Sequence, residues 1–540
     1  MRLQRFLIFL IVFFTGFVSH AQNSNGQFWT ESNARASARL ISTEKQKIYK
    51  LAVDQLKAKL NQNSKLNFSI PYPDGAFQEF KLEESPIMAP ALAKKYPNIK
   101  TYSGRNPTTG ETLRLDLSKK GFHAMVYSTE GVFFIDPVQD QSNDYQIYYK
   151  KDLKRDPKKP RFEELEPIIA DDVQFQRMQS MVESGNVNQP SGTQLRTYRI
   201  AVAATGEYTE FHGGTVEDGL SAIVSTMNRV NSIYEKEIAV RMVLVENNDE
   251  IIFTNSSTDP FTVDDVGILI DENQVVLDSI IGNQNYDLGH NFSTAAGGLA
   301  GLGVVCRSNS KARGVTGINQ PIGDPFDVDY VSHEIGHQFG APHTFNGTVS
   351  SCGQNRSANS AYEPGSGSTI MAYAGICGGD NIQNNSDPYF HTASLDFMNA
   401  YIQDNAGNNC ADITETGNNL PIVEAGQGGF TIPISTPFQL NGFATDPDGD
   451  QLNYAWEQFD LGPAGSPNLP QDNAPLFRSF SPTLDSFRIF PQISDILNGT
   501  QTKGEILPDY ARNLNFRLSV RDNQAIAAVD HDEISFSVTD

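Results

Sequence analysis

The segment His333–His343, HEIGHQFGAPH, decides how the rest of the chain is interpreted, because it holds three of the nine histidines. Residues four apart lie on the same face of a helix, so His333 and His337 can offer imidazole nitrogens to one metal ion. Gly340 provides a position where the chain can leave the helix through a left-handed conformation. The chain can then turn back, so that His343 completes a site with three histidines.

Three neutral ligands leave the fourth position of a zinc ion open for water, as a catalytic site requires. The metal lowers the pKa of that water toward neutrality, and Glu334 is the expected general base. The full pattern H-E-x-x-H-x-x-G-x-x-H is much stronger evidence than H-E-x-x-H alone, because two further residues must fall at fixed offsets. The alternative is a helix with buried, hydrogen-bonded histidines, and the spacing argues against it.

The size and charge of the chain limit the possible functions. With 540 residues it is too long for one hydrophobic core, and two to four domains are expected. Lysine and arginine number 41 against 64 acidic residues, which gives a net charge of -23. A protein with this negative charge produces an electrostatic field that repels polyanions, so nucleic acid is not expected as a partner.

The N-terminal residues have the features of an export signal. Two arginines precede an apolar run from Phe6 to Val18, and small residues follow at Ser19 and Ala21. This pattern predicts a signal peptide over residues 1–21 and an exported, soluble mature protein. The run is short for a membrane-spanning helix, which makes an uncleaved anchor the less favoured alternative.

Three regions that differ in composition and pattern follow the predicted signal peptide. Residues 22–194 carry strand-like pieces and end in segments interpreted as linker and processing region, Lys150–Arg161 and Glu183–Gln194. Residues 195–415 alternate strand and helix patterns, which predicts an α/β domain. Residues 416–540 have short strands of alternating polarity between turn residues, which predicts an immunoglobulin-like β-sandwich.

Individual elements are expected at these places. The strand-like pieces of the first part are Gly121–Ser128 and Gly131–Pro137. In the second part the strands are Thr197–Thr205, Ala239–Val245 and Asp287–Thr294, and the helices are Val216–Tyr234 and Val263–Ile281. In the third part the strands lie within 430–434, 438–445, 451–460, 514–522 and 533–540.

Four cysteines, an even number, suit disulfide formation in an oxidising compartment. Three pairings are possible. The local loop Cys352–Cys377 is the preferred one, and it leaves Cys306 to pair with Cys410.

A second motif supports the metal site. The stretch Ser368–Cys377, STIMAYAGIC, resembles the methionine turn of the metzincin zinc endopeptidases, in which Met371 would form an apolar floor beneath the ligands. Within that clan the chain is most similar to secreted bacterial reprolysin-like proteases over Thr197–Cys410. The stretch Gly323–Gly340, GDPFDVDYVSHEIGHQFG, carries much of this resemblance. It implies a metzincin catalytic domain with a mixed twisted sheet, a zinc helix and bound Zn²⁺.

Two residues depart from the reprolysin pattern. Thr344 follows the last histidine where typical reprolysins have aspartate, and the sequence there is also similar to pappalysins. Tyr373 follows Met371 by two positions, as in astacins and serralysins. It is either a fifth zinc ligand that swings away to stabilise an oxyanion or an aromatic residue of the pocket wall.

Two features lie upstream of the zinc helix. The glycine-rich stretch Gly297–Gly303 matches no phosphate-binding motif. The resemblance implies that it borders the cleft, where small residues let a peptide pair as an added strand. Asp327 is expected to cap the N-terminus of the zinc helix.

The flanking regions are interpreted through their relation to the protease. Residues 22–194 are expected to be a β-rich propeptide that contains no cysteine for a thiolate latch. In the last domain Asp446, Asp448 and Asp450 alternate around a turn and resemble calcium loops of cadherin-like and PKD-like modules. An acidic turn without Ca²⁺ is the alternative.

The sequence therefore predicts a secreted, monomeric zinc endopeptidase made as a zymogen and acting on proteins or peptides. The rival hypothesis is a surface adhesin with a structural metal site. Glu334 argues against the adhesin, because a structural site has no use for a carboxylate beside its first ligand.

Overall fold

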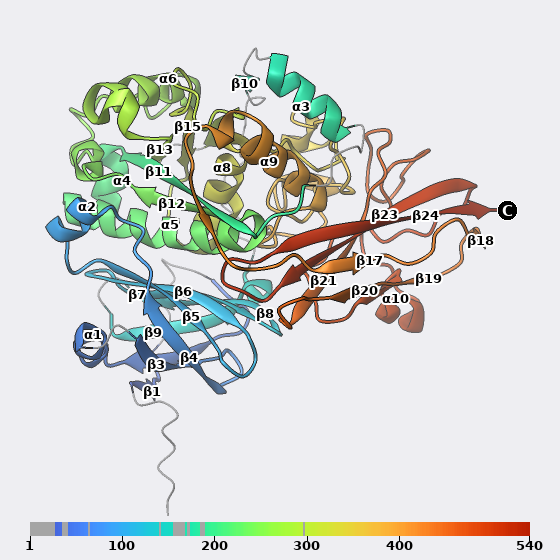
Figure 1. The fold of residues 1–540 in the computed structure, drawn as a ribbon, viewed down its shortest axis with the longest axis horizontal. Helices are drawn as coiled ribbons and strands as arrows, with labels where there is room; N and C mark the ends of the chain where they lie inside the picture. The colour runs from blue at the N-terminus through green and yellow to red at the C-terminus, as the bar shows by residue number, and fades with distance from the viewer. Residues whose placement is uncertain are drawn as a thin grey trace, which may run out of the picture.

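The structure of the protein is a computed structural model. It describes residues 28–34, 42–62, 65–139, 142–154, 168–169, 173–183, 189–294 and 297–540. The expected signal peptide lies outside these residues, and no helix among them is long and apolar enough to cross a membrane. Figure 1 shows a blue N-terminal sheet, a green and yellow central part and a red C-terminal part packed together.

The N-terminal part is one antiparallel sheet with the order β1-β2-β9-β8-β7-β6-β5-β4-β3. Its strands are β1 (Trp29–Glu31), β2 (Lys47–Leu51), β3 (Lys65–Pro71), β4 (Phe77–Glu84), β5 (Lys100–Arg105), β6 (Thr112–Ser118), β7 (Gly121–Ser128), β8 (Gly131–Pro137) and β9 (Asp144–Tyr149). The helices α1 (Val53–Gln62) and α2 (Pro90–Lys95) accompany it. The two strands predicted in this region are confirmed as β7 and β8.

The central part has the expected alternation of strands and helices. Strand β11 (Gln194–Ala204) lies between the parallel strands β12 (Val240–Leu244) and β13 (Leu288–Ser293), and β15 (Gly314–Gly317) runs parallel to β13. Strand β14 (Gly297–Leu302) is antiparallel to β15, and β16 (Asp412–Glu415) is antiparallel to β11. The principal helices are α4 (Gly206–Phe211), α5 (Val216–Ile238), α6 (Val266–Leu277), α8 (Ser332–Gln338) and α9 (Thr392–Asp404).

Helix α5 is the structural centre of the molecule. It contacts strands β6 and β7 of the N-terminal sheet on one side and β11 and β12 of the central sheet on the other (Figure 1). Covered on both sides, it is buried almost along its whole length, and its polar residues are buried as well. Its Thr215 N-cap side chain accepts a hydrogen bond from the backbone NH of Asp218.

The helix that carries His333 and His337, which the sequence predicts to be the zinc helix, begins earlier than expected. The short helix α7 (Gly323–Phe326) runs directly into a π-helical turn, Asp327–Val331, and then into α8. Asp327 therefore has a helical φ of -68° and does not cap the helix. Its carboxylate instead accepts hydrogen bonds from Thr226 Oγ1 (2.7 Å) and Arg229 (3.0 Å) of α5. The cap prediction is wrong because helical structure already extends back to Gly323.

The N-terminal sheet is joined to the central part by backbone pairing and buried ion pairs. The Ala89 NH donates to Leu244 O of the edge strand β12 (2.9 Å), and the Leu244 NH donates to Ile87 O (2.8 Å). Arg114 of β6 forms a buried ion pair with Glu235 of α5 at 2.5 Å. Removing either partner would leave the other as a buried charge without a counterion, so the two side chains depend on this packing of the N-terminal sheet against α5.

Lys150 is part of this interface. It begins the short helical turn after β9, is 7% exposed, and places its ammonium 2.5 Å from Asp324 and 3.5 Å from Asp329. Both aspartates lie on the helical turns that lead into the zinc helix. The interpretation of the basic segment as a linker is therefore wrong at its first residue, which is packed.

The C-terminal part is built from short strands. Its four-stranded sheet has the order β18-β24-β23-β21, and the pairs β17-β20 and β19-β22 stand beside it. The strands are β17 (Ile422–Glu424), β18 (Thr431–Pro433), β19 (Phe438–Asn441), β20 (Phe443–Thr445), β21 (Leu452–Gln458), β22 (Phe487–Phe490), β23 (Arg512–Asp522) and β24 (Val529–Thr539), with one helix, α10 (Ile493–Asn498). Strands occur in all five predicted segments, while the immunoglobulin-like topology stays a prediction.

The C-terminal part packs closely on the central part. Arg521 of β23 makes two 2.8 Å hydrogen bonds to the Glu237 carboxylate at the end of α5, and both side chains are buried. Its loops also hold loops of the central part: Asn346 Nδ2 donates to Pro463 O (2.9 Å), and Lys503 Nζ donates to Asn381 O (2.8 Å).

The structure contains the disulfides Cys306–Cys410 and Cys352–Cys377, which are the two expected pairs. The second links the loop after His343 to the end of the predicted methionine turn.

Candidate metal centre

The three predicted histidine ligands meet at one point. His337 Nε2 lies 3.1 Å from His333 Nε2 and 3.1 Å from His343 Nε2, and all three residues are buried. Three nitrogens bound to one tetrahedral zinc at 2.0–2.1 Å would be about 3.3 Å apart. The spacing of the imidazoles thus fits a single metal ion of this size.

Backbone carbonyls orient each ring. His333 Nδ1 lies 2.7 Å from Ile370 O, His337 Nδ1 lies 2.7 Å from Ala341 O, and His343 Nδ1 lies 2.6 Å from Asn355 O. A carbonyl can only accept, so each Nδ1 carries the proton and donates it. The three Nε2 lone pairs are then left facing one another, which is the donor set that a divalent metal requires.

The glycine after the zinc helix lets the chain turn back. Gly340 has a φ of +97°, a region that favours glycine. The Gly340 NH donates to His337 O (2.8 Å), and the Ala341 NH donates to Gly336 O (3.0 Å). His343 returns to the helix directly after this turn.

Glu334 and Tyr373 lie at the same centre. Glu334 is buried and follows the first ligand on α8. Burial and the nearby Glu334 carboxylate raise the pKa of the Tyr234 phenol well above its usual value. The Tyr373 ring lies 4.7 Å from the His343 ring and 5.6 Å from the His333 ring, measured between centroids. Its hydroxyl is buried and makes no hydrogen bond to any described residue.

Met371 packs beneath the zinc helix. Its side chain is fully buried, and its Sδ lies so close to Gly336 that an added Cβ there would collide with it. The same Cβ would lie 3.5 Å from Phe390. Gly336 therefore allows the methionine to approach the helix between His333 and His337.

Replacing Gly336 by alanine is expected to disturb this contact. The new methyl group would push Met371 away from the helix, and overpacking of a buried contact costs about 1–3 kcal/mol. The expected result is a lower unfolding temperature and weaker zinc binding, measured by thermal unfolding and chelator competition. The matched control is Gly379→Ala in a nearby loop, where an added Cβ meets nothing within 4 Å. Unchanged zinc affinity in the Gly336 variant would contradict the role of this contact.

Comparison with known families agrees with this geometry. Residues 194–401 match the model described as "Metallo-peptidase family M12B Reprolysin-like". This segment is a reprolysin-like metallopeptidase domain. The match includes the histidine triad and the predicted methionine turn of the metallopeptidase domain.

Two other comparisons add nothing to this assignment. No curated protein matches the chain. One similar solved structure is a nucleoside hydrolase-related hypothetical protein from Saccharophagus degradans that is associated with carbohydrate metabolism. It is 10% identical, with a TM-score of 0.17, and the match covers 70% of this chain and 100% of that chain. A likeness this weak supports no conclusion about the fold or the function.

Edge strand β14 of the metallopeptidase domain is paired in this structure. Residues Ile168 and Ile169 form β10, which runs parallel to β14 with Ile168 opposite Gly301 and Ile169 opposite Leu302. The glycine-rich stretch therefore accepts an added strand, and the strand comes from the N-terminal part of the same chain.

The predicted calcium residues are also brought together. One carboxylate oxygen from each of Asp446, Asp448 and Asp450 lies within 4.8 Å of the others. Each carboxylate has protein partners as well. Asp448 accepts from the Asn419 NH (2.8 Å), and Asp450 pairs with Arg105 of β5 at 3.1 Å.

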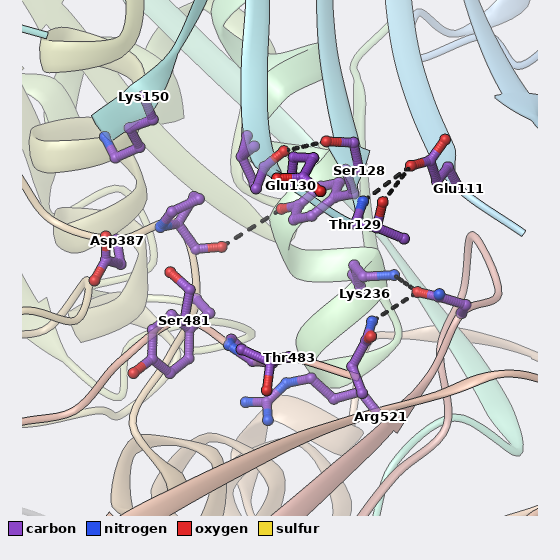
Figure 2. A pocket seen from close by; sticks show the side chains of 18 of the residues that line it. Glu111, Ser128, Thr129, Glu130, Lys150, Lys236, Asp387, Ser481, Thr483 and Arg521 are labelled. Atoms are coloured by element: carbon purple, nitrogen blue, oxygen red, sulfur yellow. Dashed lines mark hydrogen bonds between the residues drawn. The ribbon is translucent and has the colours of Figure 1, made fainter. Parts of the chain in front are cut away.

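A cavity of about 230 Å³ lies where the three parts of the chain meet, and Lys150 is one of the residues that line it. Figure 2 shows Lys236 and Arg521 on one side of it and Lys150 and Asp387 on the other. Lys236 is 5% exposed, and its ammonium has one long hydrogen bond, to Asn523 (3.4 Å). Burial lowers the pKa of Lys236 to about 8.

Replacing Lys236 by methionine is expected to stabilise the protein at pH 7. Below pH 8 the lysine is charged in both states, and only the folded state bears the cost of burying the charge. Between about pH 8 and pH 10.5 the folded protein has lost this proton while the unfolded chain still binds it. The free-energy cost of burying the charge therefore becomes smaller as the pH rises through this interval. The expected gain is about 1–3 kcal/mol at pH 7 and less at pH 10, measured by urea unfolding at both values. A variant less stable than the wild type at pH 7 would contradict this.

Sequence reasoning did not identify the groups that surround the ligands. The carbonyls of Ile370, Ala341 and Asn355 carry no sequence signal, since every residue has one. Glu363, whose carboxylate accepts from Thr344 and Thr369, was also missed, because an isolated glutamate in a loop belongs to no motif. Asp329 lines a small pocket beside His333 and Tyr373, and its only signal was proximity to the zinc helix.

Proposed function

We propose that this protein is the precursor of a secreted, zinc-dependent endopeptidase that hydrolyses peptide bonds of proteins. The observation that carries the proposal is the convergence of three Nε2 atoms, each oriented through Nδ1, in a domain of the reprolysin-like family. Glu334 beside the first ligand distinguishes this arrangement from a structural site with four protein ligands.

His333, His337 and His343 would hold the zinc ion. Bound there, zinc would act as a Lewis acid and make water a stronger nucleophile at neutral pH. Glu334 would accept the proton of the attacking water and pass it to the leaving amine. The buried hydroxyl of Tyr373 would donate a hydrogen bond to the oxygen of the scissile carbonyl as negative charge develops on it.

The N-terminal residues 22–194 would act as a propeptide. Supporting observations are the added strand β10 on the edge strand β14 and the buried contacts of Arg114 and Lys150 with the metallopeptidase domain. All four cysteines of the chain lie after residue 300, so inhibition would use steric cover and not a thiolate. Residues 1–21 would direct export and then be removed.

Calcium would bind the turn formed by Asp446, Asp448 and Asp450 in the C-terminal part, because carboxylate oxygens are its preferred ligands. In this structure Arg105 already neutralises Asp450. Calcium is therefore expected to bind more weakly to the full chain than to protein from which the N-terminal part has been removed. Isothermal titration with Ca²⁺, with Asp446→Asn as the control, tests this.

Hydrolysis of casein or gelatin by the matured protein tests the proposed function. Activity should disappear with a zinc chelator and return on addition of Zn²⁺. Activity that survives the chelator would overturn the mechanism. Zinc bound with no hydrolysis of any protein substrate would favour the adhesin.

A further inference from the structure

We propose that Glu363 is a positioning residue that fixes the third histidine ligand and the methionine turn relative to one another. The inference rests on the proposed function, since it assigns a role in building the zinc site. Glu363 lies in the loop between these two segments, twenty residues after His343 and eight before Met371 by their numbering.

The Glu363 carboxylate accepts five hydrogen bonds from residues on both sides. Thr344, the residue after His343, donates its hydroxyl to Oε2 at 2.6 Å. Ser368 donates its backbone NH (2.8 Å) and its hydroxyl (3.2 Å) to Oε1. Thr369 donates its backbone NH to Oε1 (3.2 Å) and its hydroxyl to Oε2 (2.6 Å). One carboxylate thus joins the chain after the third ligand to the chain before Met371.

An ionised carboxylate is the group that suits this position. It has no proton to donate, and three neighbouring residues offer protons through two backbone NH groups and their hydroxyls. The Ser368 hydroxyl shares its one proton between Glu363 and Ser479 O, which lies 3.0 Å away. Glu363 is 0% exposed, and none of the described lysine, arginine or histidine side chains forms an ion pair with it. A buried charge without a cation persists only where several hydrogen bonds stabilise it. The side chain is therefore held in place by its contacts, and it cannot swing away without leaving four donors unpaired: the hydroxyls of Thr344 and Thr369 and the backbone NH groups of Ser368 and Thr369.

Backbone bonds make the connection rigid. The Thr344 NH donates to Met371 O (3.1 Å), and the Glu363 NH donates to Thr344 O (2.8 Å). Ser360 Oγ donates to His343 O at 2.5 Å. Since Ile370, next to Met371, supplies the carbonyl that orients His333, a shift of this turn would move two of the three ligands together.

This arrangement explains the departure at Thr344. Typical reprolysins have aspartate at that position, whereas here a hydroxyl stands there and Glu363 brings the carboxylate from elsewhere in the chain. The pair of Thr344 and Glu363 can then be tested by moving the carboxylate from one position to the other.

The primary test is the zinc affinity of the full chain carrying Glu363→Gln, measured by competition with a chromophoric chelator. The amide keeps the shape but presents an NH₂ group to neighbours that are donors. Loss of a group that orients metal ligands typically lowers metal affinity roughly 10- to 100-fold. We expect a loss of that size. The matched control is Glu111→Gln, which should keep wild-type affinity, because Glu111 is another buried carboxylate that accepts from hydroxyl and NH groups but belongs to the N-terminal part. Wild-type zinc affinity in Glu363→Gln would overturn the inference.

A second substitution separates positioning from general damage. In the otherwise unchanged chain, Thr344→Asp would set a second carboxylate beside Glu363 and weaken zinc binding. In the Glu363→Gln variant, the same Thr344→Asp substitution would return a carboxylate to the loop. We expect the double variant to bind zinc at least threefold more tightly than Glu363→Gln; equal or weaker binding would overturn the inference. If Glu363→Gln does not fold, Thr344→Val removes a single hydrogen bond and should still weaken zinc binding, and no weakening would overturn the inference.

These results are separable from those that test the proposed function. A wild-type protein that binds zinc but hydrolyses nothing would refute the proposed peptidase activity. The zinc affinities of the Glu363 and Thr344 variants would still measure the role of Glu363. A wild-type protein that hydrolyses casein together with an unaffected Glu363→Gln would refute only the positioning role.

Discussion

Replacing Glu334 by glutamine is expected to lower kcat/KM of the matured protein about 10²- to 10⁴-fold, the usual contribution of a general base. The amide has nearly the same shape but cannot accept the proton of the attacking water. It does not belong to the ligand set, so zinc should remain bound. Hydrolysis of a casein-derived fluorogenic peptide, measured together with the zinc content, tests both statements.

The control for the Glu334 variant is His337→Ala. His337 Nε2 lies between the other two ligand nitrogens, so this variant should lose both zinc and activity. A Glu334→Gln protein that keeps more than a tenth of wild-type activity would show that another group accepts the proton.

Replacing Arg521 by methionine is expected to lower the free energy of unfolding by about 3–5 kcal/mol, because Glu237 would become a buried charge without its partner. The guanidinium makes two 2.8 Å bonds to that carboxylate and a third, of 3.3 Å, to Phe390 O. It therefore joins the C-terminal sheet both to α5 and to the chain that follows the methionine turn. Urea unfolding at pH 7 measures the effect.

Two variants show whether the Arg521 effect comes from the unpaired charge. Adding Glu237→Gln should recover part of the loss, since the amide removes the charge. Lys65→Met, which breaks an ion pair with side chains 74% and 55% exposed, should change the stability by less than about 1 kcal/mol. An Arg521 variant as stable as the Lys65 variant would mean that the C-terminal sheet does not depend on this pair.

The parts of the site that could be predicted are those encoded locally. The positions of His333, His337 and His343 follow from helical spacing and one glycine, and all fall within eleven consecutive residues. Helix α5 could likewise be predicted, because its apolar residues recur at three- and four-residue intervals over 23 residues.

The features that escaped prediction depend on contacts between distant residues. Glu237 and Arg521 are 284 residues apart, and Lys150 and Asp324 are 174 apart. No local pattern distinguishes such residues from surface charges, which is how Lys150 came to be assigned to a linker. The cap role of Asp327 failed for a related reason, since its neighbours on α5 hold its carboxylate and the helix starts upstream.

The loops of the C-terminal sheet that hold Asn346 and Asn381 have a consequence for how this protein could evolve. The match to the peptidase family ends at residue 401, whereas contacts that hold Asn346 and Asn381 come from Pro463 and Lys503, and Arg521 holds the end of α5. A gene fragment exchanged at the family boundary would carry the ligands without the neighbours that hold them. The part of the chain that must be kept together for the metal-site loops to stay in place is therefore longer than the segment that matches the family.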